Sequence, residues 1–386
     1  MTRWAILGLL PALVAGCTAP LPDGSARITP EQLLEGRPLT GGVEPGPLPD
    51  VAILELDDDM RRFVAERVPA TGPDSWRLRQ LLRSLLEDER FAIEYQERTY
   101  TAAETFRLRR ANCLAFTNLF VALAREAGLT VHFQEVDVPP DWSRAAGLLV
   151  QNRHMNTLVD VGPRLEQIVD FNMADFRTSY ERRVISDERA RAHYYSNLAA
   201  ERLEAGELVP ALQNFRKALA ADAGFVPAWI NLGSLYQRAG QPAWAEAAWL
   251  HALDLAPREF VAMSNLERLF RATGRPAEAD EFRNRLYRHR QQNPYYRYEQ
   301  ARVALAAQDY PAAIGHLRFA IERKANEDRF YALLGLAYLR RGDAASGERW
   351  MARAEELAGD ESLKQSYHSK LERLRRDQLT NGFGGS

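Results

Sequence analysis

The chain has 386 residues, of which 46% are hydrophobic and 26% charged, with a formal net charge of −2. This composition is typical of a globular protein, and the length suggests two or three domains. The near balance of charges argues against a nucleic-acid partner, because binding to phosphates needs a surplus of Lys and Arg.

The N-terminus predicts a secretory signal peptide over residues 1–16. Arg3 precedes an apolar run over residues 4–14, too short to span a bilayer, and small residues lead to Cys17. The end of this segment resembles a bacterial lipobox, which implies acylation of Cys17 and attachment to a membrane. Thr18 stands where Asp would otherwise be, and by the same resemblance this favours the outer membrane, facing the periplasm. The alternative is an ordinary signal peptide with a coincidental cysteine.

The next two stretches differ in amino-acid composition and in apolar pattern. Residues 17–50 are rich in Pro and Gly and predict an extended tether. From residue 51 a compact mixed pattern begins, in which "DDDMRRFVAERV" and "PDSWRLRQLLRSLLEDE" carry apolar residues at helical spacing. "FAIEYQERTY" suits a strand or an irregular segment. Thr101 and Glu104 form a capping box, so we expect a helix to begin there.

"RRANCLAF", residues 109–116, contains Cys113, the second of only two cysteines. Asn112 is a good helix N-cap, and Gly128 ends the apolar helical pattern that follows it. Cys113 therefore falls in the first turn, where free amides and the helix dipole lower the pKa of a thiol. With Cys17 acylated, Cys113 has no disulfide partner in the chain. It is either a reactive thiol or a buried, inert one.

A nucleophilic thiol needs a base, and the base needs an orienting group. Residues 154–161 and 165–172 both suit strands, with a turn at Gly162 and Pro163. In a tight hairpin centred on Gly162, opposite residues have numbers that sum to 324. His154 then faces Asp170 at about 5 Å between Cβ atoms. A slip of one residue would place the two side chains on opposite faces.

Other residues are alternatives for these roles. Asp175 could replace Asp170 if the register differs. His132 lies in an apparently buried strand, where we expect a packed residue rather than the base, and His193 lies at the edge of the next domain. The backbone amide of Cys113 is the natural oxyanion donor, with Gln96 or Tyr100 as side-chain candidates.

The order of Cys113, His154 and Asp170, preceded by "TAAETFRLRRANC", resembles the transglutaminase-like superfamily over residues 75–175. The resemblance implies an α+β, papain-like domain, placed at residues 51–190. It also implies Cys113 as nucleophile, His154 as base and then acid, and Asp170 as the orienting group. The chain has Ala111, Asn156 and Phe171 where the family favours Gly, Trp and Pro.

Beyond residue 190 the sequence repeats with a period of 34 residues, which predicts five helical hairpins starting at residues 192, 226, 260, 294 and 328. The second copy matches the tetratricopeptide (TPR) pattern of bulky, small and turn residues. We therefore expect an all-α TPR solenoid over residues 192–361, with a degenerate fourth unit. Residues 362–386 suit a capping helix and a disordered tail.

By resemblance, the first helix of each TPR unit lines a groove that binds proteins or peptides. The groove positions rich in Arg and Tyr, the residue types enriched at interaction hot spots, are Arg268, Arg271, Tyr295, Tyr298 and Arg302. We expect a peptide of acidic character there; a solvated face with scattered Arg is the alternative. No spacing suits a metal site or a phosphate loop, so neither metal nor cofactor is expected.

The sequence thus predicts a lipid-anchored envelope protein with a cysteine-dependent acyl-transfer domain and a TPR module that recruits a protein or peptide. Hydrolysis of an amide or peptide and transamidation both fit. The competing hypothesis is an inactive scaffold that mediates protein interactions at the envelope.

Overall fold

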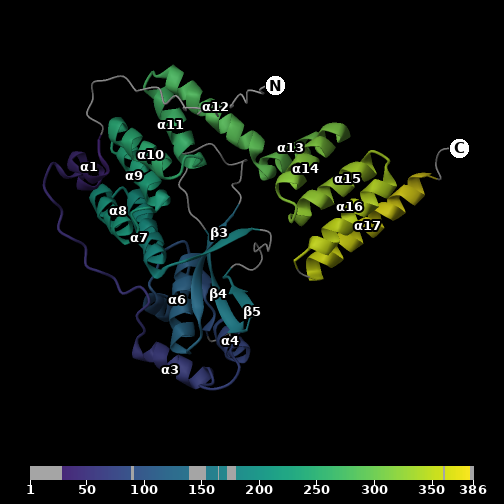
Figure 1. Ribbon diagram of the computed structural model, residues 1–386. Coiled ribbons are helices and arrows are strands. Elements are labelled where there is room, and N and C mark those ends of the chain that lie inside the picture. Colours follow the sequence, from purple (N-terminus) through teal and green to yellow (C-terminus); the bar gives the residue numbers. More distant parts are fainter. Residues whose placement is uncertain are drawn as a thin grey trace, which may run out of the picture.

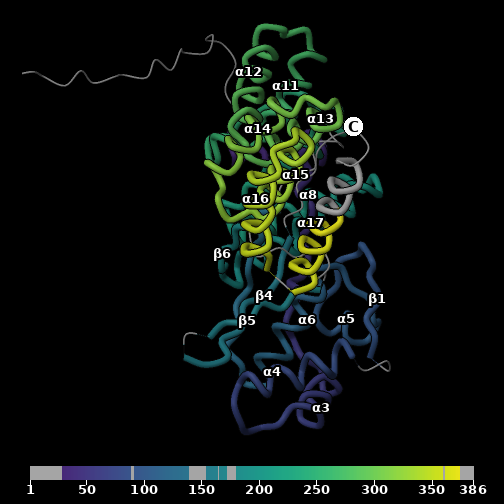
Figure 2. Tube along the Cα trace, turned by 90° about the vertical axis from the view of Figure 1, so that its right-hand side faces the viewer, coloured from purple at the N-terminus to yellow at the C-terminus, as the bar shows by residue number. Residues whose placement is uncertain are grey.

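The computed structural model describes residues 28–87, 91–138, 154–163, 165–171, 180–359 and 361–382. A mixed α/β part precedes a long array of paired helices (Figure 1). Figures 1 and 2 both place α3 and α4 at the end of the molecule opposite α11 and α12. The elements of the mixed part are α3 (Asp58–Arg67), α4 (Asp74–Leu82), the π-helical turn η1 (Arg83–Glu87), β1 (Glu94–Tyr95), α5 (Ala102–Leu108), β2 (Arg110–Ala111), α6 (Cys113–Glu126), β3 (Val131–Asp137), β4 (His154–Gly162), β5 (Leu165–Val169) and β6 (Glu181–Ile185).

Helix α6 is the centre of the mixed part. All residues from 114 to 124 are buried, and the helix packs against α3, α5, β3 and β4. The four-stranded antiparallel sheet has the order β5-β4-β3-β6, and a separate parallel pair joins β1 to β2. Val131, Phe133 and Val159 alternate along the strands and share one apolar core with α6. The sheet thereby fixes where the N-terminus of α6 lies.

The second part consists of five antiparallel helix pairs and a final helix. In four of the pairs the first helix begins at residue 226, 260, 294 or 328, at the positions given by the 34-residue repeat. The helices are α7 (Asp187–Glu204), α8 (Leu208–Ala221), α9 (Val226–Arg238), α10 (Pro242–Leu255), α11 (Phe260–Ala272), α12 (Pro276–Gln292), α13 (Pro294–Ala306), α14 (Tyr310–Arg323), α15 (Asp328–Arg340), α16 (Ala344–Leu357) and α17 (Glu361–Gly382). The chain is therefore mostly helical, with TPR-like repeats.

Position 308 distinguishes the fourth pair. The turns of the other pairs carry a glycine with positive φ, whereas the equivalent residue here is Gln308 with φ 62°. A side chain in this conformation costs roughly 1–2 kcal/mol. The fourth unit is thus degenerate in its turn as well as in its sequence.

The hydrophobic core is not continuous along the solenoid. One cluster runs from the mixed part through α7–α12 and ends at Leu286. A second begins at Ala301 and includes Phe330, and a third joins α16 to α17 through Met351 and Tyr367. The helices α13–α17 lean away from the first six helices of the solenoid (Figure 1). The α12–α13 junction is therefore a boundary between two packed bodies.

A buried carboxylate joins the mixed part to the solenoid. Glu135 on β3 is 3% exposed; its Oε1 lies 2.7 Å from His193 Nε2 and 2.6 Å from Arg189 Nε, both on α7. Arg183 on β6 adds a contact of 2.5 Å. Burial raises the pKa of Glu135, but the hydrogen bonds and positive charges of His193 and Arg189 outweigh burial and hold the pKa far below its usual range. A charged Glu135 thus links β3, β6 and the first solenoid helix.

The structure corrects the expectation of an extended tether over residues 17–50 for the described part of that range, residues 28–50. Residues Pro30–Glu35 form α1 and Arg37–Thr40 form α2, and Leu33 is completely buried. The Arg216 guanidinium donates to the carbonyl oxygens of Leu34 and Glu35, and the Tyr236 hydroxyl donates to that of Leu33. Apolar burial on the solenoid and satisfied backbone acceptors thus hold this segment in place.

The two ends of the chain differ in how far the structure describes them. Helix α17 continues to Gly382, so residues 380–382, expected to be disordered, are helical. The signal peptide and Cys17 lie outside the described residues. Among the helices of the described ranges, none combines the length and apolar character needed to cross a membrane.

We expect Gly36→Ala to release the α1 segment. Gly36 and Gly41 both have positive φ, 65° and 63°, but an added Cβ at Gly36 would lie 2.2 Å from Leu212 Cδ2, whereas nothing lies within 4 Å at Gly41. Gly41→Ala should cost about 1 kcal/mol in free energy of unfolding and Gly36→Ala clearly more. Chemical denaturation and limited proteolysis after residue 28 measure this difference. Equal losses for the two variants would contradict the docking of α1.

Candidate functional site

Cys113 is the first residue of α6. Asn112 is the N-cap: its Oδ1 accepts from the amide of Ala115 at 2.8 Å, and its Nδ2 donates to Thr99 Oγ1 at 2.9 Å. The Thr117 hydroxyl lies 2.7 Å from the carbonyl oxygen of Cys113 and 3.4 Å from that of Met155. The helix cap and this bridge to β4 hold the half-buried thiol beside the first residue of that strand.

His154 and Asp170 meet as the sequence predicts, although the hairpin register differs. Thr157 pairs with Val169 and Leu158 with Ile168, so opposite residues sum to 326 rather than 324. The two-residue shift keeps both side chains on one face. It arises because the turn pairs Gly162 with Leu165, a sum of 327, and a bulge between Asp160 and Gly162 then changes the sum by one to 326. His154 Nε2 lies 2.6 Å from Asp170 Oδ2. The pair is therefore diagonal across the strands rather than directly opposite.

Neighbouring side chains fix Asp170 in place. Its side chain is fully buried, and Asn156 Nδ2 donates to its Oδ2 at 3.1 Å. The next residue, Phe171, stacks on Phe116 of α6 with 4.7 Å between ring centroids. Asn156 therefore holds the carboxylate directly, and Phe171 packs the adjoining residue against α6.

The environment of His154 favours its charged form. Burial by itself lowers the pKa of His154, but hydrogen bonds to Asp170 and Cys113 and the negative charges of those groups outweigh burial and raise the pKa to about 10. Because Asp170 occupies Nε2, Nδ1 is the ring nitrogen left for Cys113. The three side chains thus form a chain of contacts from a helix N-terminus to a buried carboxylate.

Gln96 and Tyr100, the oxyanion candidates, lie next to the segment before Cys113. The backbone amide of Gln96 donates to the carbonyl oxygen of Ala111 at 2.9 Å. The Tyr100 hydroxyl donates to Gln96 Oε1 at 2.9 Å, which orients the Gln96 amide group and leaves its nitrogen as the donor. Of the two candidates, Gln96 is the one with a donor to offer.

The other histidines lie elsewhere. His132 is not packed in the core as expected: its side chain is 45% exposed, with Nε2 3.8 Å from Asp160 Oδ2. The reason is register, since His132 pairs with Leu158 on the face away from the apolar residues shared with α6. His193 binds Glu135. Asp175, the alternative orienting residue, lies outside the described residues.

The five residues expected in the repeat groove are not brought together as one set. The guanidinium groups of Arg268, Arg271 and Arg302 each donate to a side chain of their own helix, namely Asn265, Glu267 and Glu299. Tyr295 and Tyr298 instead flank Phe330, at 5.4 Å between ring centroids in each case. The arginines therefore have partners one turn away, and the two tyrosines pack inside the fourth and fifth units.

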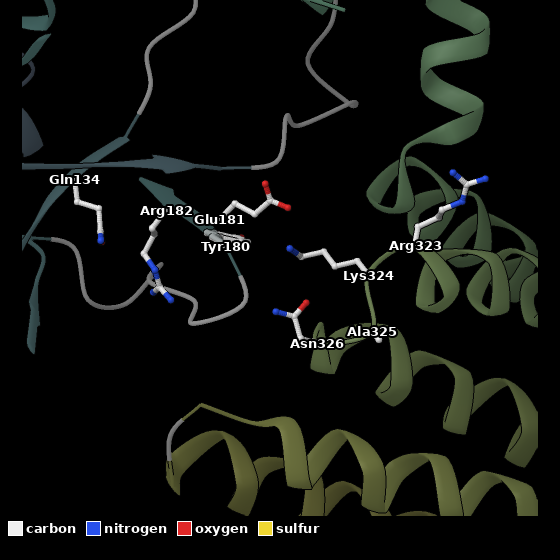
Figure 3. Close-up of a pocket in the computed structure, with 8 residues that line it drawn as sticks. All are labelled: Gln134, Tyr180, Glu181, Arg182, Arg323, Lys324, Ala325 and Asn326. Atoms are coloured by element: carbon white, nitrogen blue, oxygen red, sulfur yellow. The ribbon is translucent and has the colours of Figure 1, made fainter. Parts of the chain in front are cut away.

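A pocket that the sequence reasoning missed lies between the sheet and the solenoid. Figure 3 shows side chains from the strands on one side and from the end of α14 and the loop after it on the other. Its lining residues are Gln134, Tyr180, Glu181, Arg182, Arg323, Lys324, Ala325 and Asn326. No periodic signal could find it, because its two walls lie about 140–190 residues apart in the sequence and meet only through the fold.

A contact beside the pocket connects its two walls. The Arg329 guanidinium lies 5.9 Å from the ring centroid of Tyr180 and donates to the fully buried Glu327 at 2.6 Å. The Tyr295 hydroxyl donates to the same carboxylate at 3.0 Å. In the part of the chain that the structure describes, no group of three or more His, Cys, Asp or Glu side chains could hold a metal ion.

Comparisons with known proteins give a likeness to solved repeat structures. No protein-family model and no curated protein sequence matches the chain. The crystal structure of MamA protein is similar to this chain at 20% sequence identity, with a TM-score of 0.25. The match covers 43% of this chain and 91% of the MamA chain. YrrB, titled a TPR protein with an unusual peptide-binding site, is 18% identical, with coverages of 46% and 91% and a TM-score of 0.24. Cut9 with Hcn1, from the APC/C, is 20% identical, with coverages of 49% and 37% and a TM-score of 0.27.

We expect Asp170→Asn to lower the pKa of His154 by more than one unit, towards the ordinary value of about 6.5. Because the folded-state pKa is raised, the stabilisation from this pair is fully present below pH 6.5 and is lost as the pH rises through about 10. NMR titration of the His154 ring and unfolding curves across this pH range measure both effects. Asp160→Asn, which removes a half-exposed carboxylate near His132, is the matched control. An unchanged His154 titration in Asp170→Asn would contradict the pairing.

Proposed function

We propose that this protein is a protein-binding repeat scaffold whose mixed domain carries a cysteine-dependent acyl-transfer site. The observation that carries the proposal is the position of His154, which contacts the Cys113 thiol at a helix N-terminus and the buried Asp170 carboxylate. A thiolate, an imidazole and an orienting carboxylate are the parts that nucleophilic catalysis on a carbonyl needs. The TPR-like repeats supply surface for a protein or peptide partner.

The chemistry follows from these three groups. The Cys113 thiolate attacks an amide carbonyl carbon, forming a C–S bond, while the His154 imidazolium gives its proton to the leaving amine as the C–N bond breaks. Water or a second amine then attacks the thioester carbon and passes a proton back to His154. The C–S bond breaks, which releases the Cys113 thiolate and the carboxylic acid or the new amide. Asp170 keeps the imidazole oriented throughout, and the amides of the first turn of α6, with Gln96, face the negative charge that develops on the carbonyl oxygen.

The test is the pH dependence of iodoacetamide alkylation at Cys113, followed by mass spectrometry in a Cys17→Ser background. If His154 is charged beside the thiol, half-maximal alkylation falls well below pH 8.5, the ordinary thiol pKa. His154→Ala should then raise the midpoint by more than one pH unit, and His132→Ala should leave it in place. A midpoint near pH 8.5 in all three proteins would refute the acyl-transfer site.

The second candidate is a scaffold without catalytic activity, in which the mixed domain serves only as a platform. The feature that favours it is the extensive burial around Asp170 and Asn156, which makes the triad part of the packed structure. The alkylation experiment separates the two candidates, because a packing role alone predicts no dependence of thiol reactivity on His154.

We also propose that Cys17 is lipidated and anchors the protein to the cell envelope, most simply the outer membrane. The support is the apolar run and the lipobox-like residues that end at Cys17. The protein expressed with radiolabelled palmitate in a Gram-negative host should incorporate label and enter the detergent phase on phase partition. Cys17→Ser should lose both properties while Cys113→Ser keeps them; label on Cys17→Ser would contradict the proposal.

A further inference from the structure

The pocket between the sheet and the α14–α15 connection lies on the same sheet face as the His154 and Asp170 pair. Gln134 pairs directly with Asn156 across β3 and β4, and Asn156 donates to Asp170. Side chains that are opposite in an antiparallel pair share a face. Gln134 therefore lies two strands, or about 10 Å, from Asp170. The pocket and the proposed reaction site therefore lie on one face of the sheet, joined through the buried Asn156.

The charge of the pocket is predominantly positive. Arg182 comes from the sheet, and Arg323 and Lys324 come from the end of α14, against a single carboxylate, Glu181. In Figure 3 the Lys324 ammonium and Glu181 extend into the space between the two walls, while Arg323 extends along the solenoid. Among the described residues, neither Arg323 nor Lys324 forms an ion pair with an acidic side chain. Arg323 and Lys324 together therefore carry more positive charge than Glu181, the one carboxylate among the lining residues, can balance.

Two of these groups are built into the structure rather than loosely exposed. Lys324 is half-buried, with its Nζ 5.9 Å from the ring centroid of Tyr295, whose hydroxyl is held by Glu327. Burial lowers the pKa of Arg182, so its charged form gains from a nearby anion. These are fixed positive charges at the pocket wall.

Gln134 adds a second, independent indication of a ligand. Gln134 is only 5% exposed, and its Oε1 atom is buried without a hydrogen-bond partner in the described structure. A buried acceptor left without a donor costs roughly 1–3 kcal/mol. A backbone N–H of a bound peptide would satisfy it, which a simple anion cannot do.

We propose that this pocket binds an acidic segment of the peptide substrate, with a carboxylate near Lys324 and a backbone N–H at Gln134. The inference rests on the proposed function in so far as the bound peptide is the one that reacts at Cys113. It names the substrate class: peptides with Glu or Asp near the bond that is transferred. The binding itself requires only the pocket.

The experiment measures binding in the Cys113→Ala protein, so that no reaction takes place. Fluorescein-labelled acetyl-Ala-Glu-Ala-Glu-Ala and its Gln counterpart are compared by fluorescence anisotropy. We expect the acidic peptide to bind at least tenfold more tightly and to weaken as salt is raised. Lys324→Glu should reduce its affinity at least tenfold, whereas Lys370→Glu, which makes the same charge change on exposed α17, should not.

Gln134→Leu separates the backbone contact from the charge. It should weaken both peptides by a similar factor, because both carry the same backbone N–H groups. Equal affinities for the two peptides, no binding of either, or the same effect of Lys324→Glu and Lys370→Glu would each overturn the proposal.

The failure of this inference is distinguishable from failure of the acyl-transfer site. Alkylation of Cys113 is measured without peptide, and peptide binding is measured without Cys113. Lys324-dependent binding together with an unreactive thiol would leave a peptide-binding pocket on a scaffold. A reactive, His154-dependent thiol without such binding would support the acyl-transfer site and refute acidic peptides as its substrates.

Discussion

The arrangement of the two parts of this protein depends on the buried carboxylate of Glu135. It lies on the central strand β3 and is held by groups from β6 and from α7, the first helix of the solenoid. Removing one partner from a buried charge cluster is far more costly than removing an exposed pair. The cluster therefore requires α7 to lie at one place over the sheet. Every later repeat is stacked from that starting position, and so is the wall of the pocket formed by α14 and the loop after it.

The same sheet positions the candidate triad. β4 brings His154 to the N-terminus of α6, and β5 ends so that Asp170 is buried against it. Each element contributes one chemical group: the helix dipole and free amides for the thiol, the strand start for the imidazole, and the strand end for the carboxylate. Cys113 and His154 are the first residues of a helix and a strand, and Asp170 directly follows a strand. The arrangement thus combines the geometric requirement of a nucleophilic site with well-packed supports.

Features carried by local sequence signals were predictable, and features set by tertiary packing were not. The helix starts of four repeats, the Asn112 cap and the shared face of His154 and Asp170 follow from spacing and capping rules, whereas the first repeat begins at Asp187 rather than at the expected residue 192. The exact register does not, because it depends on where the turn closes, at Gly162 and Leu165, and on a one-residue bulge between Asp160 and Gly162. The α1 helix had a readable signal, since Thr29, Pro30 and Gln32 form a capping box with Pro in the first turn, but Pro and Gly content suggested a tether. The pocket had no local sequence signal, since its walls are brought together only by the fold.

The break in the hydrophobic core at the α12–α13 junction places the two walls of the pocket on different packed bodies. The mixed part with α7–α12 is one packed body, and α13–α17, with separate cores, is another. Tyr180, on the first body, and Arg329, on the second, meet beside the pocket, whose two walls belong to different bodies. The strained turn at Gln308 lies in the first unit of the second body. On the proposal above, a peptide that contacts both walls links the two bodies and restricts the angle between them.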